Sequence, residues 1–275
     1  MLNQDPKVVT GFGAEWASFD QTGMSRKDLE SLFAQYFGIF PWEALPKGAI
    51  GFDLGCGSGR WAQLVAPRVG ILHCIDASDT ALAVARNNLR ALGNCRFHLA
   101  DVSQMPIPDE SADFGYSLGV LHHVPDSQAA LSACAAKLKK GAPFLLYLYY
   151  AFDNKPRWYR LIWQMSQVVR HVISRLPFRL KYVLSQVIAV TVYFPLARLA
   201  LAAEKLGYNV DSMPLSYYRG RGFYVMRTDA LDRFGTRLEQ RFTRAQITAM
   251  LEAAGFSRIR FSETMPFWCV VAIRS

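Results

Sequence analysis

The chain has 275 residues, of which 51% are hydrophobic, so it can bury a substantial core and fits one domain with room for an insertion. It contains no run of about 18 or more uncharged apolar residues, and its start lacks the basic-then-apolar order of a signal peptide, which together predict a cytoplasmic location. The five cysteines form neither a CxxC pair nor a cluster with histidine, which argues against a disulfide framework and a zinc site.

The net charge of +9 is concentrated in one segment of the chain. Residues 152–227 contain 12 Lys or Arg against 3 Asp or Glu, so the remaining residues are balanced in charge. A basic excess is typical of proteins that contact nucleic acid or an anionic membrane, and here any such contact is expected to come from this segment.

The first 48 residues are expected to form an N-terminal helical cap, because residues 27–38 place apolar side chains at helical spacing. From residue 49 to residue 150, short apolar runs alternate with helical segments, which is typical of a parallel α/β sheet. Gly93 and Gly141 are expected to end two of the helices in the left-handed conformation. The predicted strands are 49–54, 71–76, 95–99, 114–118 and 143–148, and the predicted helices are 60–65, 80–91 and 128–138.

The alternation stops at residues 151–227, which predict a helical insertion of two or three helices broken at Pro177, Pro195 and Pro214. Residues 228–275 return to the core. They predict a helix at 243–254, with Thr243 as N-cap and Gly255 as its stop, and then strands at 258–262 and 269–274.

A strand runs into a glycine loop at residues 50–59, which read Ile-Gly-Phe-Asp-Leu-Gly-Cys-Gly-Ser-Gly. Glycines at alternate positions let the backbone turn tightly and approach a ligand, so we expect a cofactor at the carboxyl end of this strand. A dinucleotide fingerprint, GxGxxG, would need its third glycine at position 60, which is Arg60. The spacing therefore disfavours a dinucleotide.

The segment from Asp53 to Gly59 resembles the first motif of the class I methyltransferases at every fixed position. This resemblance implies a Rossmann-like α/β fold, with a seven-stranded, mostly parallel sheet and helices on both faces, and S-adenosylmethionine as the cofactor. In that family the loop packs on the methionine part of the cofactor, and the acid helps to fix the loop and the aminoacyl group.

Two further acids match the same family. Asp76 ends the second predicted strand, where the family has a carboxylate that accepts hydrogen bonds from both ribose hydroxyls. Asp101 follows the third predicted strand, where the family has a short acid that accepts a hydrogen bond from the adenine amino group. The alternatives are a stabilising acid at a helix N-terminus for Asp76 and a turn residue for Asp101. In this context we interpret both as ligands.

Residues 114–125 are similar to the stretch after the fourth strand in small-molecule members, where Ser117 to His122 would lie beneath the sulfonium and face the substrate. Residues 244–256 are similar to the family's helix-to-strand ending. The cofactor-binding residues that the resemblance implies are Trp16, Asp53, Gly55, Cys56, Gly57, Ser58, Gly59, Asp76, Ala77, Asp101, Val102, Ser117 and Leu118.

The methyl acceptor is expected to be a small-molecule or lipid-like compound that is methylated on O, N or C. Nucleic-acid enzymes of this superfamily carry an Asn/Asp-Pro-Pro-aromatic stretch after the fourth strand, or a Pro-Cys pair, and residues 117–120 contain neither. Nucleic acid is therefore disfavoured as a partner. An RNA methyltransferase and a non-catalytic protein with this fold are the alternatives.

His122 and His123 are the candidate catalytic residues, because an imidazole can take a proton from a hydroxyl or an ammonium group. The alternative is a structural loop feature with one ring packed and one solvated, since methyl transfer can proceed by alignment and desolvation alone.

Phe12, Glu15, Trp16 and Phe19 resemble the N-terminal lid of some small-molecule members, whose aromatics close over the cofactor. An aromatic face beside a sulfonium would gain about 0.5–2 kcal/mol of cation–π attraction. Core aromatics of a cap helix are the equal alternative.

Residues 154–203 contain eight Lys or Arg, no acidic residue and many large apolar side chains. The uncharged stretch 182–197 is too short to span a bilayer and contains Pro195. An interfacial helix would have this composition and would contact an anionic membrane at its inner face. A helical lid over the pocket would have the same composition.

The loop that contains Arg219 and Arg221 could bind a carboxylate or phosphate, or it could lie on the surface without a ligand.

Overall fold

The computed structural model of the chain describes residues 2–275. Contacts within the chain group it into two compact units. Unit 1 comprises the residues up to Gln21, Glu30–Ala151 and Leu238–Ser275, and unit 2 comprises Thr22–Leu29 and Phe152–Arg237. The cofactor motifs found in the sequence all belong to unit 1, and the basic apolar segment belongs to unit 2.

Seven strands of unit 1 form one sheet in the order β3-β2-β1-β4-β5-β7-β6. Strand β7 runs antiparallel to both of its neighbours, β5 and β6, and the remaining pairs are parallel. This sheet confirms the predicted fold class, and it brings the carboxyl ends of β1 to β4 to one edge, where ligands bind in open α/β sheets. The strands are β1 (Ile50–Leu54), β2 (Ile71–Asp76), β3 (Cys95–Leu99), β4 (Phe114–Leu118), β5 (Pro143–Tyr147), β6 (Phe256–Phe261) and β7 (Cys269–Arg274).

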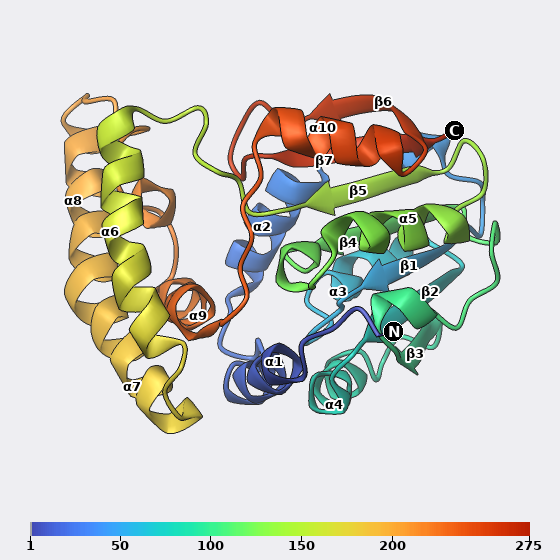
Figure 1. Cartoon of the computed structure of the whole chain (residues 1–275), viewed down its shortest axis with the longest axis horizontal. Helices are drawn as coiled ribbons and strands as arrows, with labels where there is room; N and C mark the ends of the chain where they lie inside the picture. The colour runs from blue at the N-terminus through green and yellow to red at the C-terminus, as the bar shows by residue number, and fades with distance from the viewer. Residues whose placement is uncertain (1) are drawn as a thin grey trace. The chain divides into compact units, whose positions relative to one another are not determined.

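Helices cover both faces of this sheet (Figure 1). On one face α5 packs with α10, and Phe52, Leu131 and Phe144 share a buried apolar cluster there. On the other face the ring of Tyr116 meets that of Phe37 in α2 at a centroid distance of 5.2 Å. The helices are α1 (Pro6–Ser18), α2 (Arg26–Phe37), α3 (Ala62–Val65), α4 (Asp79–Asn88), α5 (Ser127–Lys137) and α10 (Arg244–Ala253), with α2 divided between the units.

The residues predicted to cap or end helices are partly confirmed. Thr243 caps α10 in a full capping box with Gln246, and Gly255 follows the helix at a φ of +84°. The assignment of Gly93 as a left-handed helix cap is wrong, because α4 already ends at Asn88 and the buried Leu89 serves as its C-cap. Gly141 does have a left-handed φ of +82°, but it lies in the turn that leads into β5.

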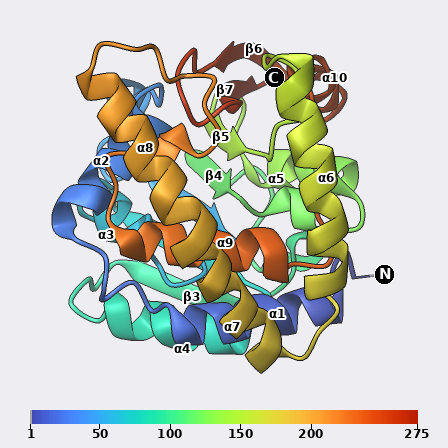
Figure 2. The same cartoon turned by 90° about the vertical axis from the view of Figure 1, so that its left-hand side faces the viewer.

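Unit 2 is helical and has a small core of its own. It contains α6 (Arg157–Ile173), α7 (Phe178–Ile188), α8 (Phe194–Lys205) and α9 (Phe223–Gly235). Helix α9 packs against α6 and α7, and Figure 2 shows it running behind both of them. The buried residues of this core are Ile173, Ala189, Tyr193, Ala197, Met226, Ala230 and Phe234.

The predicted break at Pro195 is wrong, since α7 and α8 belong to one continuous helix of 28 residues, Phe178–Lys205. A π-helical turn, Ala189–Tyr193, joins them, and the amide of Phe194 donates to the carbonyl of Ala189. Proline lacks an amide N–H and crowds the carbonyl four residues earlier, and the wider π turn accommodates both effects. Among residues 2–275 this is the one helix whose length and composition would allow it to cross a membrane. The prediction that the apolar stretch of this segment is too short to span a bilayer is therefore also wrong.

Candidate functional site

A cavity with about 940 Å³ of empty space opens at the carboxyl ends of the parallel strands in unit 1. Its walls come from the N-terminal segment and α1, the glycine loop after β1, and the turns that follow β2, β3 and β4. This is the position expected for a cofactor in an open α/β sheet.

Most of the predicted site residues line this cavity. Those in its wall are Trp16, Gly55, Cys56, Ser58, Asp76, Ala77, Asp101, Val102, Leu118 and His123. The predicted residues that the structure places outside the wall are Asp53, Gly57, Gly59, Ser117 and His122. Asp53 and Gly57 of the second group belong to the support of the glycine loop, as the contacts below show.

The glycine loop is held to the sheet and covered by α1. The amides of Gly55 and Cys56 both donate to the carbonyl of Ile75, at 2.8 and 3.0 Å. Gly57 has a φ of +54°, and a Cβ atom there would come within 2.8 Å of the Trp16 indole. Glycine is therefore required at position 57 both by the backbone conformation and by the close approach of α1.

Asp53 lies beneath the loop as a buried group. The hydroxyl of Tyr116 donates to its Oδ2 atom at 3.0 Å. Burial raises the pKa of Asp53 to about 8. The hydrogen bond from Tyr116 lowers this pKa, and the charge of Asp76 raises it further. Asp53 is therefore mostly protonated at neutral pH and serves as an uncharged support under the loop.

Asp76 connects the glycine loop to the end of β2. Its Oδ2 accepts from the amide of Gly57 and its Oδ1 from the amide of Ser78, both at 2.9 Å. Burial raises the pKa of Asp76, while these backbone hydrogen bonds oppose the increase. Each carboxylate oxygen can accept a second hydrogen bond, so Asp76 can still receive two hydroxyl protons from the cavity.

Asp101 presents one saturated and one unsatisfied oxygen. Its Oδ1 accepts from the amide and the hydroxyl of Ser103, at 2.7 and 2.6 Å. Its Oδ2 is buried and has no hydrogen-bond partner among residues 2–275. Because buried acceptors are almost always paired in native proteins, this oxygen in the cavity wall is suited to a donor group on a ligand.

Arg60 is a functional candidate that the sequence reasoning used only to disfavour a dinucleotide. It lines the cavity, and its guanidinium carbon lies 4.4 Å from the ring centroid of Trp61 and 5.9 Å from that of Trp16. Its buried Nε has no hydrogen-bond partner within the described part of the chain. A stacked cation next to the glycine loop fits a ligand carboxylate, and its position directly after Gly59 is the signal that could have revealed it.

The N-terminal segment forms one wall of the cavity. Phe12 and Trp16 of α1 reach it, whereas Glu15 and Phe19 are buried away from it. Asn3 precedes α1 and lines the cavity too. It exchanges two hydrogen bonds with the backbone of Asp126, at 2.7 and 2.9 Å. The predicted lid region is thus a helix, and two of its four proposed residues face the cavity.

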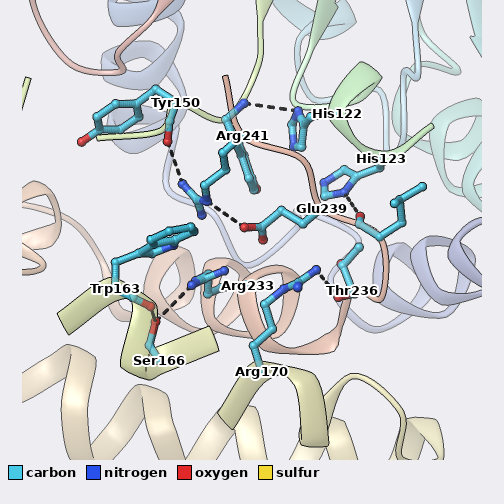
Figure 3. Close-up of polar contacts among 12 residues, drawn as sticks. His122, His123, Tyr150, Trp163, Ser166, Arg170, Arg233, Thr236, Glu239 and Arg241 are labelled. Atoms are coloured by element: carbon cyan, nitrogen blue, oxygen red, sulfur yellow. Dashed lines mark hydrogen bonds and ion pairs between the residues drawn. The ribbon is translucent and has the colours of Figure 1, made fainter. Parts of the chain in front are cut away.

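The two histidines have different surroundings (Figure 3). His122 is fully buried, its ring stacks on that of Tyr149 at 3.8 Å between centroids, and its Nδ1 accepts weakly from the Tyr149 amide at 3.4 Å. Burial, followed by the charges of His123 and Arg241, lowers its pKa well below the ordinary value. His122 is therefore a neutral packing residue.

His123 lines the cavity and has a defined tautomer. Its Nδ1 lies 2.6 Å from the carbonyl oxygen of Leu238 (Figure 3). A carbonyl oxygen only accepts, so Nδ1 carries the hydrogen and Nε2 is the basic nitrogen of the neutral ring. The ring of Phe12 lies 4.9 Å from that of His123 between centroids. Of the two candidate catalytic residues, His123 is thus the one positioned to accept a proton.

The arginines of residues 217–224 in unit 2 are engaged within that unit. Arg219 forms an ion pair with Glu204 at 2.8 Å, and Arg221 stacks on Tyr217 at 4.0 Å. Arg198 donates to the carbonyls of both arginines, at 3.2 Å each. These contacts favour a structural role for the loop.

Comparison with known proteins agrees with this geometry. Residues 52–146 match the family model described as "Methyltransferase domain". Residues 52–146, in the core of unit 1, are thus similar to a methyltransferase domain. This domain includes the glycine loop, Asp76 and Asp101, and the family match and fold support S-adenosylmethionine as its cofactor.

Three similar proteins illustrate the match. An O-methyltransferase of Pyrenophora dematioidea is 34% identical over 94 residues, which are 33% of this chain and 35% of that protein. A ubiquinone biosynthesis O-methyltransferase of Coxiella burnetii is 28% identical over 40% of this chain and 54% of its own length. The structure of a phosphoethanolamine N-methyltransferase 2 of Haemonchus contortus with S-adenosylmethionine has a TM-score of 0.52, at 17% identity, over 94% of this chain and 44% of that chain.

These similarities have a defined extent. The chain spans about a third to a half of the length of the two curated relatives that it matches. At 17% identity the solved structure shows a shared fold. The likeness therefore covers the methyltransferase domain match and the fold.

Proposed function

We propose that the chain transfers the methyl group of S-adenosylmethionine to an O, N or C atom of a small-molecule acceptor with lipid-like character. The buried, unsatisfied Oδ2 of Asp101 in the cavity wall carries this proposal. It suits the adenine amino group, while Asp76 suits the ribose hydroxyls and Arg60 the carboxylate of the methionine part. The relatives named for ubiquinone biosynthesis and for phosphoethanolamine methylation support a small-molecule acceptor.

The bound cofactor supplies an electrophilic methyl group on a sulfonium. Asp76, Asp101 and Arg60 would hold this cofactor in the cavity, and the methyl group would pass to an electron pair of the acceptor while the carbon–sulfur electrons would remain on sulfur as S-adenosylhomocysteine. His123 Nε2 can take the proton that the acceptor loses, because Nδ1 is engaged with the Leu238 carbonyl. Phe12 and Trp16 exclude water from that side of the cavity.

Isothermal titration calorimetry with S-adenosylmethionine, S-adenosylhomocysteine and NAD tests the cofactor. We expect heat with the first two, and heat with NAD alone would overturn the proposal. Turnover is tested by the release of S-adenosylhomocysteine with fractions of a cell extract as the source of acceptor. Cofactor binding without turnover in every fraction would favour a non-catalytic protein instead.

We further propose a cytoplasmic location at the inner face of the membrane and no nucleic-acid partner. The balanced charge of the chain outside residues 152–227 supports the second point, since a phosphate-binding surface would require cations around the catalytic cavity. Tight RNA binding that weakens steeply with added salt would contradict it. Fractionation of cells that express the tagged chain tests the location.

A further inference from the structure

Unit 2 exposes an unusual amount of apolar surface. Of the 20 large hydrophobic side chains that are exposed among residues 2–275, 18 belong to unit 2. The other two are Leu2 and Leu99. Contiguous exposed apolar patches of this kind mark contact surfaces, because water penalises them in an isolated soluble protein.

On α6 the exposed side chains follow one stripe along the helix. Trp158, Leu161, Met165, Val168 and Val172 recur at intervals of three or four residues and are 48–69% exposed. The opposite side of this helix packs against α9. Helix α6 is therefore amphipathic, with its apolar face directed away from the core of unit 2.

The long helix Phe178–Lys205 has the same two-sided character. Val183, Val187 and Val190 are 50–56% exposed, whereas Ser185 and Ala189 on the other side are fully buried. Ala189 belongs to the small core that α9 completes. At 1.5 Å per residue the helix is about 42 Å long, so its apolar face forms an extended strip.

Cations surround these two apolar faces. Residues 154–203 contain eight Lys or Arg and no acidic residue. Arg157 and Arg160 are exposed at the start of α6, and Arg175 and Arg179 are exposed around the turn that leads into α7. We propose that unit 2 binds an anionic lipid bilayer, with α6 and the helix Phe178–Lys205 lying in the plane of the interface.

The packing within unit 2 favours a helix that lies on the bilayer over one that crosses it. Arg227 of α9 donates to Gln186 at 2.5 Å and to the Tyr182 hydroxyl at 3.1 Å, both on α7. If the long helix spanned the membrane, this guanidinium would enter hydrocarbon, where a cation is strongly disfavoured. In the interfacial orientation Arg227 stays on the protein side.

Charge also favours lipid over a second copy of the chain. A symmetric dimer through these faces would bring the cations of 154–203 on one copy against the same cations on the other, because both partners of a two-fold interface present the same patch. An anionic bilayer neutralises them instead. This inference does not depend on the proposed methyl transfer, since none of its residues belongs to unit 1.

Co-sedimentation of the full chain with vesicles tests the proposal. We expect binding to vesicles of phosphatidylcholine with phosphatidylglycerol, weaker binding to phosphatidylcholine alone, and release as salt rises from 0.1 M to 0.5 M, conditions over which charge screening becomes strong. Alkaline carbonate should release the bound chain from the vesicles. A chain that stays in the supernatant with the anionic vesicles, or that resists carbonate, would overturn the interfacial assignment.

The double variant V183Q/V187Q removes two exposed apolar side chains from the strip, and L2Q/L99Q removes two from unit 1. We expect the first to lower the vesicle partition coefficient about tenfold or more, and the second to leave it within about twofold. Equal partitioning of the two variants would overturn the proposal. Circular dichroism and thermal unfolding confirm that each variant folds. Light scattering in the absence of lipid shows whether the chain forms a dimer. A dimer that forms through this apolar face would contradict the proposal of lipid binding.

Discussion

The indole of Trp16 lies so close to Gly57 that a Cβ atom at residue 57 would approach its Cε2 to 2.8 Å. This contact fixes α1 against the glycine loop from the cavity side, although Gly57 itself does not line the cavity. The amide of the same glycine donates to Asp76. One residue thus determines the position of both the helix wall and the acid at the end of β2.

Gly57→Ala is expected to weaken S-adenosylhomocysteine binding by about tenfold or more, because alanine is strained at a φ of +54° and its methyl group would displace Trp16. Isothermal titration calorimetry measures the change. The double variant W16A/G57A relieves the clash but keeps the backbone strain, so it should fold more stably than G57A. Unchanged affinity in G57A would show that the contact is unimportant for the site.

Asp101→Ala tests the unsatisfied carboxylate oxygen directly. A hydrogen bond to a charged group contributes about 1.5–3 kcal/mol, so we expect the affinity for S-adenosylmethionine to fall by about 10- to 150-fold. Asp109→Ala is the matched control, since that acid is 70% exposed and pairs with Lys137 on the surface. If the two variants bind the cofactor equally well in calorimetry, Asp101 is not a ligand.

His123→Gln should lower kcat and leave cofactor affinity nearly unchanged. Glutamine keeps a polar side chain but supplies no base, and general-base catalysis is worth about 10²- to 10⁴-fold. His122→Gln should instead reduce the free energy of unfolding, because that ring is buried and stacked on Tyr149. Initial rates of S-adenosylhomocysteine release and urea unfolding separate the two effects. Full activity in H123Q would mean that alignment alone drives the transfer.

Asp53→Asn should change how stability depends on pH. The folded state raises the pKa of Asp53 from 3.8 to about 8, so between these values the folded chain keeps a proton that the unfolded chain has lost. The stability contributed by this group is complete below pH 4 and is lost as the pH rises toward 8. Asparagine cannot titrate but can still accept from Tyr116.

We therefore expect the free energy of unfolding of D53N, relative to the parent chain, to increase from pH 4.5 to pH 8. Urea unfolding at several pH values measures the difference. Asp109→Asn, on the exposed surface, serves as the comparison and should follow the parent. Parallel pH profiles for D53N and the parent would mean that Asp53 is ionised in the folded chain.

The sheet and the turn after each of its first strands were predictable because local patterns determine them. Strands β2, β3, β4 and β7 coincide with the predicted ranges, since short apolar runs between turn residues leave little freedom in a parallel sheet. Asp76 and Asp101 follow from the same logic, because the carboxyl ends of neighbouring strands meet at one edge.

Other features depend on contacts between distant residues. The burial of Asp53 under Tyr116 joins β1 to β4, and no local pattern distinguishes a supporting acid from a ligand. The continuous helix through Pro195 requires a π turn, whose hydrogen bonds are not encoded by periodicity. Separating His122 from His123 likewise required the contacts of Tyr149 and Leu238.

The paired hydrogen bonds between Asn3 and the backbone of Asp126 fasten the start of α1 next to the cavity. Asn3, Phe12 and Trp16 all line the cavity, so opening of this clasp and of the first turn of α1 would widen the cavity on that side. Exchange of spent cofactor for fresh would then depend on how often this helix end is open, as well as on the bonds that hold the cofactor. Residence time and affinity would be controlled by different residues of the same site.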